Sequence, residues 1–164
     1  MLETRIDQIE LLKNLLIDSN DSNRLSILYA AWASVYTTGS EFLKKSVLSI
    51  VAEPSTMQKR DIEFAVARMG VTNPYFIARQ YVNIEAGGSL EALNFRSLSM
   101  LNIENEQAYH HACVAISVIN GGHVCLHSHV ASLQNSNESD EHIDISMRIA
   151  AVSHSLNILT RVDV

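Results

Sequence analysis

The spacing of apolar residues limits the fold of this 164-residue chain more than any other feature, because they recur every three to four positions along most of it. At the start of the chain this pattern is carried by Leu2, Ile6, Ile9, Leu12 and Leu16. Such a stripe, with charged residues between its members, is typical of an amphipathic α-helix. The alternation of apolar and polar residues that a half-buried strand requires is absent. We therefore expect an all-α protein of eight or nine helices.

Turn-forming residues divide the pattern into segments. Gly70 is placed to end one helix, and Asn73-Pro74 is typical of an N-cap followed by proline at the first helical position. The Gly121-Gly122 pair separates two strongly patterned segments. The expected helices span residues 2–18, 24–37, 41–51, 56–69, 74–85, 90–101, 104–119, 123–134 and 139–160.

The composition predicts one folded domain over residues 1–164, since 47% of the residues are hydrophobic and 18% are charged. The formal charge of -6, with 12 scattered lysine and arginine residues, argues against nucleic acid as a partner. The longest nearly apolar run, 112–119, is far shorter than the about 20 residues that span a bilayer. Charged residues within 1–18 predict that no secretory leader is present. Two cysteines without a leader fit a reducing cytoplasm, where a disulfide is transient or catalytic.

Four titratable side chains lie within the seven residues 123–129, directly after the glycine pair. Cys125 falls in the first turn of the expected helix, where free N–H groups and the helix dipole stabilise a thiolate and lower the thiol pKa. His129 is four residues further on the same face, placed to accept the thiol proton or to stabilise the thiolate as imidazolium. Taken alone, the C-x-x-x-H spacing favours the simpler interpretation that Cys125 is a small buried apolar residue and His129 an ordinary polar one.

The neighbouring histidines and the other cysteine offer weaker alternatives. His123 and His127 are also four residues apart, but two ligands on one face do not complete a tetrahedral zinc site, so we expect neither metal nor cofactor. Cys113 lies twelve residues before Cys125, about 18 Å away in a continuous helix and beyond the disulfide limit of about 7 Å. A reversal at the glycine pair would shorten this distance, but the apolar neighbours of Cys113 favour a buried, inert thiol.

Residues 120–129, Asn-Gly-Gly-His-Val-Cys-Leu-His-Ser-His, resemble the redox motif N-G-C-x-x-C-x-x-x-H of the alkyl hydroperoxide reductase D (AhpD) and carboxymuconolactone decarboxylase group. The similarity extends over 115–119 and 147–154, and residues 65–76 resemble the family's Met-Gly-Met-Asn-Asn-x-Tyr-Tyr segment. The resemblance implies an AhpD-like helical fold and a usually trimeric antioxidant enzyme of the cytoplasm. In this family the second cysteine attacks the peroxide, the first resolves the sulfenic acid as a disulfide, and the histidine activates the thiol. Bacterial members also return electrons to a partner peroxiredoxin, AhpC.

Carried over by position, the resemblance makes Cys125 the peroxidatic cysteine and His129 its activating base. The family's acidic proton-relay residue falls on His110. Its histidine before the second cysteine falls on Val124, with His123 one residue away. The resemblance therefore makes Cys125, His129, His110 and His123 the candidate site residues.

Gly122 stands where the family has its resolving cysteine. Without a thiol there the family's internal disulfide cycle cannot run, since Cys113 has no evident route to Cys125, and Gly122→Cys is expected to restore it. Two functions remain open: a peroxidase in which Cys125 acts alone and is reduced by an external thiol, and a binding scaffold with little catalysis. The presence of both Cys125 and His129 at the family spacing favours the peroxidase. A buried helix face between subunits of a homo-oligomer is also expected.

Overall fold

The computed structural model describes residues 3–162, which form seven α-helices and three short 3₁₀ helices and contain no strand. The all-α prediction is therefore confirmed, while Leu2, the first residue of the predicted apolar stripe, lies outside the described residues. The α-helices are α1 (Ile6–Ile17), α2 (Arg24–Thr38), α3 (Glu41–Leu48), α4 (Thr56–Tyr81), α5 (Glu106–Asn120), α6 (His123–Asn135) and α7 (Asp140–Arg161). The 3₁₀ helices are η1 (Glu3–Arg5), η2 (Glu91–Leu93) and η3 (Leu98–Leu101). None of the helices in residues 3–162 is long and apolar enough to cross a membrane.

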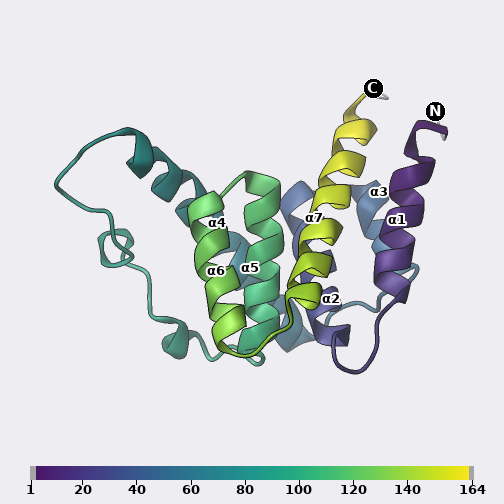
Figure 1. Ribbon diagram of the computed structural model, residues 1–164, viewed down its shortest axis with the longest axis horizontal. Coiled ribbons are helices and arrows are strands. Elements are labelled where there is room, and N and C mark those ends of the chain that lie inside the picture. The colour runs from purple at the N-terminus through teal and green to yellow at the C-terminus, as the bar shows by residue number, and fades with distance from the viewer. Residues whose placement is uncertain (1–2, 163–164) are drawn as a thin grey trace.

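Helix α2 is the centre of the core, because every residue from Ser26 to Val35 is buried. A helix that is apolar all round has to be covered on all sides, and α2 packs against α3, α4, α5 and α7. Its Trp32 is fully buried and its indole N–H donates a hydrogen bond to the carbonyl of Ala52, 2.9 Å away. Figure 1 shows α1 beside α7 at one end of the bundle, and α5 beside α6 towards the other.

Residues 56–81 form one continuous helix, α4, so the predicted break at Gly70 and Asn73-Pro74 is wrong. The missing N–H of Pro74 would have bonded to the carbonyl of Gly70, and α4 continues without that bond. The Asn73 side chain does not cap its own backbone. It donates a hydrogen bond to Ser117 Oγ at 3.1 Å and accepts one from Asn120 Nδ2 at 3.1 Å. These hydrogen bonds to α5 stabilise α4 at the position where the local sequence predicts that a helix ends.

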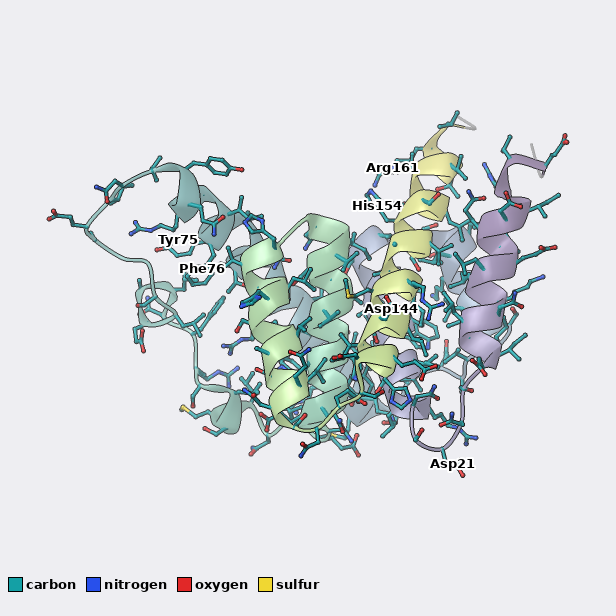
Figure 2. All side chains as sticks on the ribbon, in the orientation of Figure 1. Asp21, Tyr75, Phe76, Asp144, His154 and Arg161 are labelled. Atoms are coloured by element: carbon teal, nitrogen blue, oxygen red, sulfur yellow. The ribbon has the colours of Figure 1, made fainter. Side chains whose placement is uncertain are left out.

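The segment 82–105 projects from the bundle after α4 (Figure 1). The helix predicted over 90–101 is absent and is replaced by η2 and η3. Asn94 and Asn102 directly follow these 3₁₀ helices with φ of 54° and 50°, and such left-handed residues prevent a right-handed helix from continuing. The start of the segment is fixed to α4, because the N–H of Gly88 donates to the Tyr75 hydroxyl at 2.8 Å. Figure 2 shows Tyr75 and its neighbour Phe76 at the end of α4, on the side of this segment.

The Gly121-Gly122 pair turns the chain back on itself, so that α5 and α6 pack as an antiparallel hairpin. Gly121 has a φ of 67°, which glycine adopts without strain. The N–H of Gly122 donates to the carbonyl of Ser117 at 2.7 Å and closes the end of α5. Helix α6 begins at His123, which confirms that a helix starts after the glycine pair with Cys125 in its first turn.

Candidate functional site

A cavity of about 500 Å³ lies between α4, α5, α6 and the projecting segment. Its apolar wall is formed mainly by Met69, Phe76, Leu90, Leu98 and Val124. Its polar lining includes Cys125, His129, His110, Tyr109 and Arg68. No group of three or more His, Cys, Asp or Glu side chains within residues 3–162 is arranged to hold a metal ion. The cavity places a thiol, two imidazoles and a guanidinium beside apolar side chains.

Cys125 is the cysteine that lines the cavity, although only 7% of its surface is exposed. It lies in the first turn of α6, and no side chain of the described residues caps this helix start. The N–H groups and the positive end of the helix dipole are then available to stabilise negative charge that develops on the sulfur. This placement favours Cys125 as a nucleophile.

His129 and His110 face each other across the α5–α6 hairpin, with their Nδ1 atoms 2.8 Å apart. At that distance one ring donates an N–H and the other accepts it, so the tautomers of the two rings are linked. The resemblance placed His110 at the position of the family's acidic relay residue, and the structure places its ring against that of His129. Glu106, which was not among the predicted site residues, lies beyond His110 with its carboxylate 3.7 Å from His110 Nε2. Its i, i+4 spacing from His110 was the signal that could have indicated it.

Glu106 interacts with His110 through charge and not through a hydrogen bond, since 3.7 Å exceeds hydrogen-bond length. Within the histidine pair one Nδ1 donates and the other accepts, and either choice of tautomers satisfies the contact. In both cases Nε2 of His129 takes no part in the pair.

Burial lowers the pKa of His129 to about 3, and the positive charges of His110 and Arg68 act in the same direction. Burial also lowers the pKa of His110, although Glu106 opposes this effect. His129 is therefore uncharged near neutral pH, and burial makes the predicted imidazolium costly to form. In the described part of the chain no hydrogen bond joins His129 directly to Cys125. A proton can pass between them only through a molecule bound in the cavity that both residues line.

Stability should fall as the pH drops from about 7 to about 5. Burial is the largest cause of the lowered pKa of His129, and the same is true of His110 and His111. The unfolded chain therefore binds protons below about pH 6.5 that the folded protein does not, and the stability present above this pH is lost as the pH falls. For His129, with a pKa of about 3, this loss continues down to that value. Urea unfolding of the wild type and His129→Asn at both pH values checks this, because the variant should lose less stability. A wild type that becomes more stable at the lower pH contradicts it.

Asn73 fills the space where a side chain at position 122 would lie. A Cβ atom on Gly122 would be 2.3 Å from Asn73 Nδ2 and 2.4 Å from its Cγ. Asn73 is 1% exposed and fixed by Ser117 and Asn120, so it has little room to move aside. The native packing thus has no place for a resolving cysteine at this position. The expectation that Gly122→Cys restores a disulfide does not fit this structure.

His123 and His127 lie outside the cavity. Both are exposed, and His123 Nε2 contacts Gln80 Oε1 of α4 instead of a reactive group. The predicted site residues that the structure brings together are therefore Cys125, His129 and His110, without His123.

A second polar cluster lies outside the cavity and connects α5 to α7. Buried His111 contacts Glu138 Oε2 at 2.9 Å and Ser146 Oγ at 2.8 Å, and His142 Nδ1 contacts the other oxygen of Glu138 at 2.9 Å. Burial alone would raise the pKa of Glu138, but hydrogen bonds from His111, the Ser139 N–H and His142 lower it overall. Each of these polar groups has a hydrogen-bond partner, which is typical of a cluster that stabilises the packing of two helices.

Two curated proteins resemble this chain, both named alkyl hydroperoxide reductase AhpD and both from Caulobacter vibrioides, strains NA1000 / CB15N and ATCC 19089 / CIP 103742 / CB 15. In each, 92 residues align with 38% identity, covering 54% of this chain and 48% of the relative. The chain thus spans about half the length of the curated relatives it matches. No protein-family model matches the chain. The similarity to AhpD supports the resemblance at the level of the family.

Proposed function

We propose that this protein reduces organic hydroperoxides through the thiol of Cys125. The observation that carries the proposal is the arrangement in one cavity of a cysteine in the first turn of a helix and a neutral histidine that is paired with a second histidine. The similarity to proteins named alkyl hydroperoxide reductase supports the same chemistry. The apolar wall of the cavity suits the organic part of an alkyl hydroperoxide better than it suits hydrogen peroxide.

The reaction follows from the positions of these groups. The Cys125 sulfur attacks the terminal oxygen of the hydroperoxide, and the O–O bond breaks to give a sulfenic acid and an alcohol. His129 Nε2 accepts the thiol proton and returns it to the alkoxide that leaves. His129 carries the proton only between these two steps, because its burial disfavours the charged form.

The sulfenic acid then has to be reduced by a second thiol. Gly122 offers none, so the electrons come from another thiol, in this chain or outside it. We propose an external thiol reductant as the final electron donor. An AhpC-type peroxiredoxin is the partner that the family resemblance implies.

A peroxide-consumption assay tests the proposal against the alternative of a non-catalytic scaffold. With cumene hydroperoxide and an excess of dithiothreitol, the wild type should turn over continuously, whereas without the thiol it should stop after a single oxidation. Cys125→Ser should remain at the rate of the buffer under both conditions. Equal peroxide consumption by Cys125→Ser and the wild type would contradict the role of Cys125. No peroxide consumption by either protein would leave only the non-catalytic scaffold.

We also propose that the chain forms a homo-oligomer, with a trimer as the state that the family implies. Large apolar side chains are exposed on the end of α4 and the segment after it, and Tyr81 is 81% exposed there. The others in this region are Val82, Ile84, Leu90 and Met100. Exposed apolar side chains that gather on one face commonly mark an interface between proteins. Light scattering during size exclusion at micromolar concentration should give a multiple of 18.2 kDa, and a monomeric mass would contradict it.

A further inference from the structure

Cys113 lies opposite Cys125 across the α5–α6 hairpin. The contact between His110 and His129, 2.8 Å long, fixes which residues of the two helices face each other. Cys113 is three residues from His110 towards the glycine turn, and Cys125 is four residues from His129 towards the same turn. Residues three or four apart share one face of a helix. The two cysteines therefore lie at one level, one turn closer to Gly121 than the histidine pair.

The surroundings of the two thiols agree with this register. Cys113 is 0% exposed and belongs to the same buried apolar cluster as Cys125. Burial is the main cause that raises the pKa of the Cys113 thiol to about 12, and the nearby Cys125 adds to the effect. Directly facing Cα atoms of closely packed helices are about 3.4–5.4 Å apart, since the axes are about 8–10 Å apart and each helix has a radius of about 2.3 Å. This range overlaps that of disulfides, whose Cα atoms are usually about 4.4–6.8 Å apart.

The two cysteines differ in their access to the cavity, and this difference determines which of them a hydroperoxide oxidises first. Cys125 lines the cavity, whereas Cys113 does not. A hydroperoxide in the cavity therefore meets Cys125 first. The raised pKa of Cys113 also keeps it protonated and unreactive towards peroxide until a sulfenic acid forms beside it.

We propose that Cys113 is the resolving thiol for Cys125, forming a disulfide across the α5–α6 hairpin in place of the one that Gly122 cannot make. This inference rests on the proposed oxidation of Cys125 by a hydroperoxide. The Cys113 sulfur attacks the sulfenic sulfur of Cys125, the S–O bond breaks as the S–S bond forms, and the hydroxyl leaves with the Cys113 proton as water. Fixed proximity compensates for the small thiolate fraction of Cys113. An external thiol then reduces the disulfide and restores both cysteines.

The test uses the wild-type chain, Cys113→Ala and Cys113→Ser, each treated with one equivalent of cumene hydroperoxide and no added thiol. Dimedone, which traps sulfenic acids, is present, and the products are mapped by peptide mass spectrometry. The wild type should lose two hydrogens and give a peptide that links residues 113 and 125 within one chain. Both Cys113 variants should instead accumulate dimedone on Cys125. Urea unfolding of each variant confirms that it is folded, and Cys113→Ala avoids placing a hydroxyl in the core.

Three results would overturn the inference. Equal dimedone labelling of Cys125 in the wild type and the Cys113 variants would remove Cys113 from the cycle and leave the peroxide chemistry of Cys125 intact. A disulfide between two chains, seen on a non-reducing gel, would assign resolution to a second molecule. No oxidation of Cys125 in any of the three proteins would refute the proposed function itself, and this inference with it.

Discussion

Replacing Gly122 by alanine should lower the free energy of unfolding by about 2–4 kcal/mol, a large effect for one methyl group. The new Cβ would lie 2.3 Å from Asn73 Nδ2, and Asn73 can withdraw only by breaking its hydrogen bonds to Ser117 and Asn120. Gly122→Cys should cost at least as much, because its sulfur needs further room. Urea unfolding followed by circular dichroism measures the change.

Gly70→Ala is the matched control, because a Cβ atom at Gly70 would have no atom within 4 Å. In an α-helix this change should leave stability unaltered or raise it by up to about 1 kcal/mol. The Asn73→Ala background supplies the second control, since it removes the Asn73 atoms closest to position 122. Gly122→Ala should then cost less than it does in the wild type. Equal costs in the two backgrounds would show that Asn73 does not occupy this space.

His129→Asn should lower the rate of hydroperoxide reduction by about 100-fold to 1,000-fold, within the usual range for loss of a general base. Asparagine retains polarity but cannot take up the Cys125 proton. The rate of the wild type should not fall through a histidine titration near about pH 6.5, because the pKa of His129 is about 3. Steady-state kinetics with cumene hydroperoxide and excess thiol measure both effects.

His127→Asn is the matched control for this prediction. His127 lies on the same helix, two residues before His129, but it is exposed and does not line the cavity. Its replacement should leave the rate unchanged. Equal losses in the two variants would show that the effect is not specific to the histidine in the cavity.

Much of the fold could be predicted from local sequence patterns. The stripe of apolar residues and the glycine pair predicted α1, α2, α6 and α7 to within a few residues. The prediction failed at α4, where the break expected at Gly70 and Pro74 is overridden by the bonds of Asn73 to a helix more than forty residues away. It also failed at 90–101, where helical spacing alone could not indicate the left-handed asparagines that end η2 and η3.

The site was predicted in part for similar reasons. Cys125 and His129 belong to one helix, so their spacing could be interpreted without the fold. The resemblance assigned His110 a relay role, but its contact with His129 depends on the packing of α5 against α6. No local pattern indicates that Asn73 fills the space beside Gly122, or that Cys113 faces Cys125 across the hairpin. These relations between distant residues appear only when the helices are in place.

We expect the fold to make Cys125 a reactive thiol. Two single-cysteine proteins, Cys113→Ala and Cys125→Ser, test this when each is measured folded and unfolded in urea. The rate of sulfenic acid formation with cumene hydroperoxide is followed by dimedone labelling and mass spectrometry. Folding should speed the oxidation of Cys125, through the helix start and His129, and should slow that of buried Cys113. If both thiols react more slowly in the folded protein than in the unfolded chain, the account is contradicted.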